Sequence, residues 1–394
     1  MLNIFIHIKI GEEKSIALAK TYRSFLGYVS FYHYVNNLIL CKLIVLSRKE
    51  AITKMSKKYL IAKLQLSGVK FLTKVVSFPR PLVFMGKDSA LQLCSNISQV
   101  GVQHILIVTD DILFQLGVIQ PLQDALHRHN VNVSVFTGVK PDPTIAIVEQ
   151  GLVMLKQKHC DGVLAVGGGS AIDTAKVIAL SAANHKAPQK LVGMLKARKP
   201  ALPLFAIPTT SGTGSEVTVG AVVSDSKTHQ KSLVIDPKIV PLAAALDPKI
   251  TSGMPASITA DTGLDALTHA LEAWVSSFAH HESDYYAQAA VKLIFDHLVT
   301  AYQDGKNLPA REAMALASHY AGLAINHTGV GYVHAFAHQL GAKYHIPHGR
   351  ANAVVLPHVF EFHRDVCEVR LAQLAKNIGL VGVNSSAAHA TDAL

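Results

Sequence analysis

The chain changes its hydrophobic pattern near residue 254, from short apolar runs to long helical periods. Before that point, apolar runs of strand length alternate with amphipathic stretches of helix length. They predict strands at 104–111, 131–139 and 161–166 and helices at 117–129, 145–158 and 171–183. Further strands are predicted at 203–210, 231–237 and 243–247. This alternation predicts a parallel sheet with helices on its faces.

The pattern after residue 254 is that of helices alone. Ala, Leu and His recur with helical spacing over 259–278, 283–303 and 309–326, with few strand signals. We therefore predict an α/β domain at 76–254 followed by an all-helical domain at 255–394, with no internal repeat. The 394 residues, 49% of them hydrophobic, are enough for two domains with sizeable cores.

The N-terminal segment differs from the rest of the chain in charge. Residues 1–80 hold 14 Lys and Arg against 3 Asp and Glu, whereas the remaining residues hold 23 against 24. The net charge of +10 therefore resides in this segment, and the folded body is nearly neutral. Because that body has no basic stripe with interleaved aromatic residues, we do not expect nucleic-acid binding.

Residues 1–75 are interpreted as a basic and apolar extension outside the two domains. The run 25–46 is long enough to span a bilayer. Polar residues interrupt it, however, namely His33, Asn36, Asn37 and Lys42. We therefore do not expect a membrane span. Met55, followed by SKKYL, is typical of a natural start, so residues 1–54 are expected to be non-catalytic.

The cysteines are too scattered to form a disulfide framework or a thiolate zinc site. The four, which show no CxxC spacing, are Cys41, Cys94, Cys160 and Cys367. A reducing cytoplasm is the simplest setting for such a chain.

A glycine-rich turn joins the strand at 161–166 to the helix that follows it. The turn consists of Gly167, Gly168, Gly169 and Ser170. Glycines let a diphosphate approach the backbone, and the N–H groups of the next helix favour negative charge. The turn is not GxGxxG, so a tight structural turn is the alternative. Asp173, three residues into the helix, is a further cofactor candidate, or simply a carboxylate near a helix N-terminus.

A second loop, PTTSGTGSE at 208–216, follows the strand at 203–210. Its hydroxyl groups, those of Thr209, Thr210 and Thr213 among them, suit a ribose or phosphate, although a surface turn has the same composition. Ligands of open α/β sheets bind at this end of the strands. Asp110 ends another strand there, where a carboxylate favours NAD over NADP; the alternative is a cap on the next helix.

The helical region holds one carboxylate and several histidines with the spacing of a metal site. Asp265 and His269 are four residues apart, so they share one face of a helix. His334 and His338 repeat that spacing, and His348 follows in a Pro-His-Gly turn. These ligands suit iron or zinc.

Two groups of histidines near this metal pattern receive other interpretations. His338 is a candidate proton relay beside the metal. The neighbouring His280, His281 and Glu282 are expected in a loop and are left out of the site.

The motifs of the chain, taken together, resemble those of the iron-containing (group III) alcohol dehydrogenases. They are VTDD, GVKPDPT, AVGGGSAIDTAK, AIPTTSGTGSEVT, GLDALTHALEAW and GYVHAFAHQLGAKYHIPHGRANAVVLPHV. They occur in the family's order and cover about residues 80–380. The resemblance implies an α/β dinucleotide-binding domain, a helical metal-binding domain and an active site in the cleft between them.

The resemblance also implies roles for individual residues. The iron ligands correspond to Asp265, His269, His334 and His348, and His338 corresponds to a histidine near the nicotinamide. The cofactor-contacting positions correspond to Asp110, Gly167, Gly168, Gly169, Ser170, Thr209, Thr210, Thr213 and Lys231.

The function implied is that of a metal-dependent, NAD-linked alcohol dehydrogenase. It would interconvert a small primary alcohol or diol and its aldehyde by hydride transfer, with Fe²⁺ as the metal, Zn²⁺ as the alternative, and a homodimer as the assembly. Two alternatives share the fold: a glycerol-dehydrogenase-like enzyme and a hydroxyacid-oxoacid transhydrogenase-like enzyme. A third is a non-catalytic, truncated or membrane-associated copy.

Three features depart from the family pattern. Ala171 stands where proline is usual, a change that the first turn of a helix tolerates. Residues 1 to about 70 have no counterpart. The chain also ends several dozen residues before the family's usual end, so we expect helices that pack on the metal-bearing ones to be missing.

Overall fold

The computed structural model of the protein describes residues 78–225 and 231–394. Residues 76–394 form one compact unit, and the fold described below is that of this unit. The predicted extension, with its apolar run at 25–46, lies outside the described residues.

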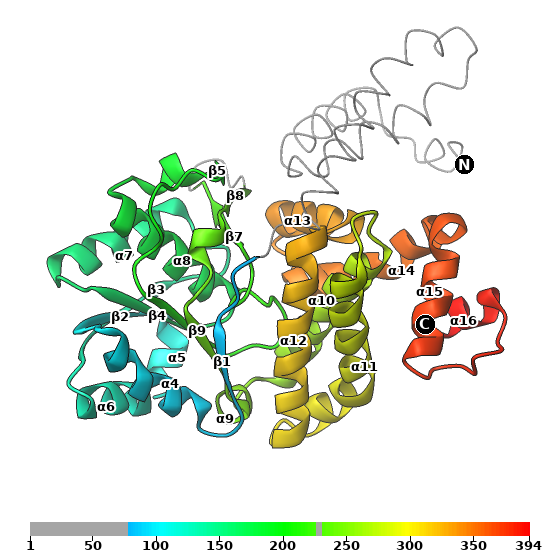
Figure 1. The fold of residues 1–394 in the computed structure, drawn as a ribbon, viewed down its shortest axis with the longest axis horizontal. Coiled ribbons are helices and arrows are strands. Elements are labelled where there is room, and N and C mark those ends of the chain that lie inside the picture. The colour runs from blue at the N-terminus through cyan, green and yellow to red at the C-terminus, as the bar shows by residue number, and fades with distance from the viewer. Residues whose placement is uncertain (1–77, 226–230) are drawn as a thin grey trace, which may run out of the picture. The chain divides into compact units, whose positions relative to one another are not determined.

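A six-stranded parallel sheet forms the first half of this unit (Figure 1). Its strands, in spatial order, are β1 (Leu82–Met85), β9 (Ala243–Leu246), β6 (Leu204–Pro208), β4 (Gly162–Gly167), β2 (His104–Asp110) and β3 (Asn132–Val139). Neighbouring strands pair in parallel throughout. The carboxyl ends of all six strands therefore lie along one edge of the sheet.

Helices cover both faces of the sheet, which explains why its central strands carry apolar side chains at consecutive positions. Helices α7 (Ile145–Gln157) and α8 (Gly169–Asn184) lie on one face, and α4 (Ser89–Ile97) and α6 (Gln120–Arg128) lie on the other (Figure 1). In β2, Leu106 and Val108 enter the core beneath α7 and α8. Ile105 and Ile107 enter the opposite core. Alternate side chains thus serve two cores, as in doubly covered parallel sheets.

Smaller elements complete the α/β half. A three-stranded sheet contains β5 (Gly193–Met194), β8 (Lys231–Ile235) and β7 (Gly220–Ser224), in that order. The predicted strand at 231–237 belongs to this second sheet because β8 pairs antiparallel with β7. The short helices are α5 (Asp111–Gln115), α9 (Pro248–Thr251), and the 3₁₀ turns η2 (Ser98–Val100), η3 (Pro188–Leu191) and η4 (Pro237–Ile239).

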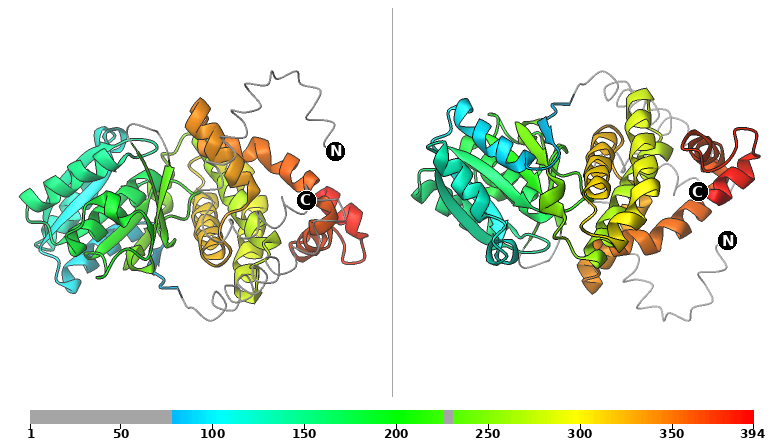
Figure 2. Two further views of the ribbon diagram at one scale, coloured as in Figure 1. Left: turned by 90° about the horizontal axis from the view of Figure 1, so that it is seen from above. Right: turned by 90° about the horizontal axis from the view of Figure 1, so that it is seen from below.

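The second half of the unit is helical. Its elements are α10 (Ala256–Val275), α11 (His281–Gln303), α12 (Leu308–Thr328), α13 (Tyr332–Tyr344), α14 (His348–Phe362), α15 (Arg364–Asn377) and α16 (Ala387–Ala393). No strand follows β9 in the part of the chain that the structure describes. Figure 2 shows these later helices, coloured yellow to red, gathered beside the sheet. The predicted fold class is confirmed.

One local prediction is wrong. His280, His281 and Glu282 do not form a loop, because α11 already begins at His281. The His280 ring accepts a hydrogen bond from the backbone N–H of Glu282. The hydroxyl of Ser283 accepts one from the backbone N–H of His280, so the two residues cap the helix reciprocally. A histidine in the capping position is why the start of the helix was not predicted.

None of the helices among residues 78–225 and 231–394 is both long and apolar enough to cross a membrane.

Candidate active site

The glycine turn lies at the carboxyl edge of the sheet, between β4 and α8. Gly168 is the N-cap of α8, and no side chain caps that helix end. Gly167 has a φ of 157°, and a Cβ there would lie 2.5 Å from the Cβ of Ala171. The turn is therefore tight, and the backbone N–H groups of a 16-residue helix face the sheet edge. This arrangement fits a dinucleotide phosphate.

The hydroxyl loop after β6 packs directly on this turn. A Cβ on Gly168 would lie 3.3 Å from Thr210 Oγ1, and one on Gly169 would lie 2.7 Å from Thr213 Cγ2. Thr209, buried beside them, donates its backbone N–H to the carbonyl of Gly167. The two loops, predicted separately from the sequence, thus form one surface, and the glycines make their close approach possible.

Asp173 does not occupy the position of a simple carboxylate near a helix N-terminus, which was the alternative to cofactor binding. Its carboxylate accepts hydrogen bonds from the Ser215 hydroxyl and, at 2.8 Å, from the backbone N–H of Val222. It therefore ties α8 to the hydroxyl loop and to β7, and does not serve as a simple carboxylate at the helix N-terminus. Its pKa is raised because it is buried.

The hydroxyl loop, which continues through residues 217–219 to β7, is also held from both sides. On the sheet side, the fully buried ammonium of Lys176 donates to the carbonyl of Thr218 at 2.7 Å. On the helical side, the Asn326 amide donates to the Val217 carbonyl and accepts from the Val219 N–H, each at 2.9 Å. The loop therefore joins α8 to α12.

Asp110 and Lys231 approach the same edge. Asp110 Oδ1 accepts a hydrogen bond from the Leu113 N–H at 2.9 Å, so the carboxylate caps α5, which was the alternative to ribose binding. Lys231 forms an ion pair with Asp142 at 2.7 Å. A Cβ on Gly341 of α13 would lie 4.0 Å from Lys231 Nζ. Lys231 therefore reaches from the small sheet to the histidine-bearing helices.

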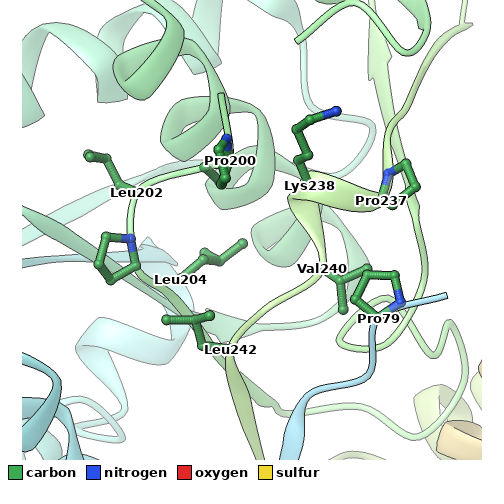
Figure 3. Close-up of a pocket in the computed structure, with 10 residues that line it drawn as sticks. Pro79, Pro200, Leu202, Leu204, Pro237, Lys238, Val240 and Leu242 are labelled. Carbon is green, nitrogen blue, oxygen red and sulfur yellow. The ribbon is translucent and has the colours of Figure 1, made fainter. Parts of the chain in front are cut away.

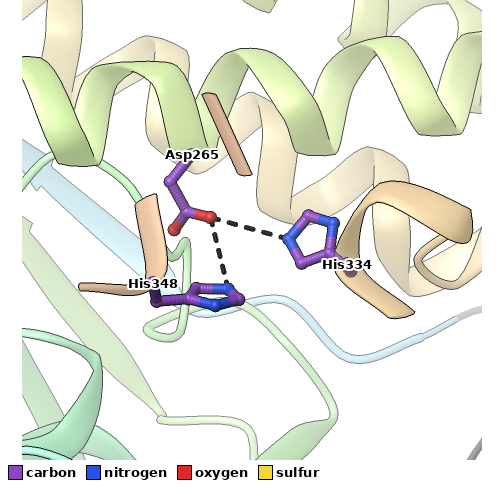
Figure 4. A group of neighbouring side chains, drawn as sticks. All are labelled: Asp265, His334 and His348. Atoms are coloured by element: carbon purple, nitrogen blue, oxygen red, sulfur yellow. Dashed lines mark ion pairs between the residues drawn. The ribbon is translucent and has the colours of Figure 1, made fainter. Parts of the chain in front are cut away.

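Three of the predicted metal ligands converge (Figure 4). Asp265 comes from the middle of α10, His334 from the start of α13, and His348 is the first residue of α14. One ligand atom from each lies within 4.8 Å of the others. His334 Nε2 and His348 Nε2 each lie 3.5 Å from Asp265 Oδ1.

Two further predicted histidines flank this group. His269 lies outside the three-residue group, but its ring stacks on that of His334 with centroids 4.4 Å apart. Its Nδ1 atom is buried and has no hydrogen-bond partner among the described residues. The ring of His338 lies 6.0 Å from that of His334 and 5.0 Å from that of His348. The structure therefore brings all five side chains together.

Two buried residues of the site were not predicted from the sequence. Glu272 Oε2 lies 2.6 Å from His334 Nδ1. The Asn352 amide donates to Asp265 Oδ1 at 2.7 Å and lies within 3.4 Å of His348 Nε2. Helical spacing contained both signals, since Glu272 follows His269 by three residues and Asn352 follows His348 by four.

Burial keeps three of the imidazoles neutral. It lowers the pKa of His269 to about 4 and that of His348 to about 4. Burial, and then the neighbouring His348, place the pKa of His338 well below its ordinary value. A neutral imidazole has a free lone pair, which it needs in order to bind a metal ion or accept a proton.

The carboxylates set the charge of the rest of the cluster. Burial alone raises the pKa of Asp265, but the surrounding histidines outweigh burial and hold its pKa well below the usual range. Burial lowers the pKa of His334, but the carboxylates of Glu272 and Asp265 outweigh it and raise the pKa to about 9. A metal ion that binds His334 therefore displaces a proton.

The donor set fits a divalent first-row metal. One ionised carboxylate and imidazole nitrogens from three helices converge, and beside them His269, whose ring stacks on that of His334, has a buried Nδ1 without a hydrogen-bond partner among the described residues. Nitrogen and oxygen ligands in this mixture suit iron or zinc.

A separate hollow of about 360 Å³ lies at the opposite edge of the sheet (Figure 3). Leu204, the first residue of β6, and Leu242, just before β9, belong to its lining, so it lies at the amino ends of the strands. Prolines and aliphatic residues line it, and Lys238 is the one ionisable residue among them. It lacks the convergent polar groups of a catalytic site.

Comparison with known proteins agrees with this geometry. Residues 80–248 match the model of the iron-containing alcohol dehydrogenases, and residues 259–394 match that of the C-terminal part of the Fe-containing alcohol dehydrogenase family. Alcohol dehydrogenase 4 of Saccharomyces cerevisiae is 41% identical over 301 residues, which cover 76% of this chain and 79% of the yeast protein.

Solved structures give the same result. The crystal structure of a 1,3-propanediol oxidoreductase aligns with a TM-score of 0.78 and 36% identity, covering 81% of this chain and 84% of that one. Sulfoacetaldehyde reductase from Bifidobacterium kashiwanohense, in complex with NAD⁺, aligns with a TM-score of 0.73 and 31% identity, covering 81% and 85%. The chain thus belongs to the iron-containing alcohol dehydrogenase family and is an oxidoreductase that acts on alcohols.

Proposed function

We propose that the protein oxidises a small primary alcohol or diol, or reduces the matching aldehyde, at the cluster around Asp265. The observation that supports this proposal is the convergence of Asp265, His334 and His348 within 4.8 Å. Lys231, from the half of the unit that carries the glycine turn, reaches the helix that carries His334. Metal-type donors and a dinucleotide-type loop thus lie on adjoining elements.

Four residues would hold the metal ion, namely Asp265, His269, His334 and His348. The ion would supply Lewis acidity, which lowers the pKa of an alcohol and polarises an aldehyde carbonyl. Asp265 contributes a permanent negative charge, and the buried imidazoles contribute neutral donors that are already oriented by their neighbours.

His338 is proposed to carry the proton. Its ring lies 5.0 Å from that of His348, beside the metal ligands but outside the three-residue group. Because burial keeps it neutral, its free nitrogen can accept the alcohol proton and pass it towards solvent.

The dinucleotide is proposed to lie along the carboxyl edge of the sheet. The residues that would contact it are Asp110, Gly167, Gly168, Gly169, Ser170, Thr209, Thr210, Thr213 and Lys231. The α8 N-terminus favours the phosphates, and the Asp110 carboxylate favours NAD because it repels a 2′-phosphate. Asp173 acts on this site through Ser215, to which it is hydrogen-bonded.

The organisation that goes with this function has three parts. We propose residues 76–254 as the NAD-binding domain, residues 255–394 as the metal-binding domain and residues 1–75 as an extension without a catalytic role. We further propose a homodimer in the cytoplasm. The free thiols of Cys94, Cys160 and Cys367 fit that reducing setting.

The test is NADH formation by anaerobically purified protein of known metal content. Short primary alcohols and terminal diols are supplied with NAD, with and without added Fe²⁺ or Zn²⁺. We expect turnover that rises with Fe²⁺ and falls when NADP replaces NAD. Preference for glycerol would favour the glycerol-dehydrogenase-like alternative, and no NADH from any alcohol at full metal content would exclude the proposal.

A further inference from the structure

Glu272 is the buried acid of the helical half that has the most hydrogen bonds to other elements. It lies on α10, seven residues after Asp265 and three after His269, so it shares their face of the helix. Only 5% of it is exposed. A buried carboxylate needs hydrogen-bond donors around it. Among the described residues, the donors to Glu272 all come from the start of α13.

The carboxylate receives three hydrogen bonds from the first turn of α13. The backbone N–H groups of Gly331 and Val333 donate to it at 2.7 Å and 2.6 Å. His334 Nδ1 lies 2.6 Å from Oε2. Gly331 is the N-cap of α13 and has no side chain of its own to cap the helix, so Glu272 takes that role from another helix.

This geometry determines which nitrogen of His334 carries the ring proton. Because the carboxylate already faces two N–H donors, it acts as an acceptor, and the Nδ1 of His334 must donate to it. When a metal ion displaces the second ring proton, the lone pair lies on Nε2, the atom that faces Asp265 Oδ1 at 3.5 Å. The hydrogen bond also fixes the plane of the ring.

We propose that Glu272 is a positioning residue, which caps α13 and holds His334 with its Nε2 lone pair directed at the metal. This inference rests on the proposed function, because it assigns His334 as a ligand. One carboxylate thereby sets both the position of the helix that carries the ligand and the tautomer of the ligand itself.

Gly331 supports the same assignment. A Cβ at this residue would lie 2.6 Å from Glu272 Oε1, so only glycine leaves room for the carboxylate. Its φ of −107° and ψ of −152° are extended values that other residues adopt. The glycine is therefore required by contact with Glu272 and not by backbone conformation.

The test is a titration of metal-free protein with Co²⁺, followed by its visible d–d spectrum and by competition with a chelator. In Glu272→Gln one of the two acceptor oxygens becomes an N–H₂ group, so the side chain can no longer accept from Gly331, Val333 and His334 together. We expect Co²⁺ affinity to fall about 10- to 100-fold, as for other partners of metal-bound histidines, and the spectrum to change. The far-ultraviolet circular dichroism should stay as in the wild type.

The matched control is Glu216→Gln. Glu216 is also a buried glutamate, 2% exposed, beside a histidine Nδ1, that of His319 at 3.1 Å, but neither residue is proposed as a ligand. We expect this variant to lose stability while its Co²⁺ affinity and spectrum stay unchanged. Equal losses of affinity in the two glutamine variants would overturn the inference, because they would indicate a general loss of packing.

A second variant decides the question if Glu272→Gln does not fold. Gly331→Ala keeps the carboxylate but displaces it, so Co²⁺ affinity should fall and the spectrum should change in the same direction. Wild-type affinity in either folded variant overturns the inference. The proposed function has a separate test. It fails if wild-type protein does not bind Co²⁺, or if His334→Ala binds Co²⁺ as tightly as the wild type. Failure of the proposed function is thereby distinguished from failure of the role of Glu272.

Discussion

The unit contains two buried glutamate–histidine pairs, and they differ in what surrounds them. Glu272 and His334 lie 2.6 Å apart, and Glu216 and His319 lie 3.1 Å apart, each through Nδ1 of the ring. All four residues are at most 6% exposed. In both pairs a glutamate oxygen lies beside the Nδ1 atom of a buried histidine. The pairs differ in the groups that surround them.

The second nitrogen of His334 faces the carboxylate of Asp265 and the amide of Asn352. Asp265 Oδ1 lies 3.5 Å away, and Asn352 Nδ2 lies 3.2 Å away. The pair of Glu216 and His319 instead lies where the hydroxyl loop meets α12. The comparison teaches that a buried glutamate–histidine pair becomes part of a metal site only when further donors converge on the free nitrogen.

The largest expected difference is between the variants that remove the histidine of each pair, His334→Ala and His319→Ala. His334→Ala should lose the metal and reduce NADH formation to roughly 1% or less, because losing even a supporting partner costs 10- to 100-fold. His319→Ala should retain metal, yet lose about 1–3 kcal/mol of unfolding free energy because Glu216 is left unpaired. Metal analysis and urea denaturation of both variants check this contrast. Full activity and metal content in His334→Ala would remove the distinction between the pairs.

His269 tests how far the metal site extends beyond the group of Asp265, His334 and His348. Its ring stacks on that of His334, but it lies outside the group. We expect His269→Ala to weaken Co²⁺ binding about 10-fold or more, because the unpartnered Nδ1 marks it as a donor. Chelator competition measures the change. Unaltered affinity would restrict the ligands to Asp265, His334 and His348.

A smaller effect is expected where the other pair joins the loop to α12. A Cβ on Gly322 would lie 2.7 Å from Val217 Cγ1 and 2.8 Å from the Gly214 carbonyl. Gly322→Ala should therefore cost about 1–3 kcal/mol of unfolding free energy through overpacking, and weaken NAD binding without changing Co²⁺ affinity.

The control for Gly322→Ala is Gly253→Ala, where the nearest atom to an added Cβ is 4.0 Å away. It should change the unfolding free energy by no more than about 1 kcal/mol. Denaturation curves and NADH binding titrations distinguish the two alanine variants, and similar losses in both would show that the loop contact is not tight.

An effect that appears only at alkaline pH concerns Lys176, whose pKa is lowered to about 8 by burial, against the opposing charges of Asp173 and Glu216. Between pH 8 and the ordinary value of 10.5, the unfolded chain binds more protons than the folded one. The free energy of unfolding therefore rises with pH in this window, at most by about 1.4 kcal/mol per pH unit. Lys176→Met should abolish this rise, so the wild-type minus variant difference should increase above pH 8. A difference that stays flat would contradict the lowered pKa.

The central fold was predictable because its strands serve two cores. Ile105 through Val108 are apolar at four consecutive positions, which is the pattern of a doubly covered strand. Strands β1, β5 and β7 were not predicted. Strand β1 is a four-residue edge strand whose side chains are exposed or half-buried, so it lacks both alternation and a fully apolar run.

The site was predictable only where one helix supplied the pattern. Asp265 and His269 share a helix face, as do His334 and His338, and those spacings are visible in the sequence. Glu272 was missed because a glutamate in a helix usually faces solvent. Its role depends on the N-terminus of α13, which lies 59 residues away from it along the chain.

The hydroxyl loop has a mechanical consequence for any movement between the two halves of the unit. Lys176 fastens it to α8 and Asn326 fastens it to α12, so at this point the two halves of the unit share one piece of backbone. Any movement between the two halves would therefore be restrained at this loop, as it is at the covalent connection 247–255. It would be small beside the loop, which would leave the threonines in place.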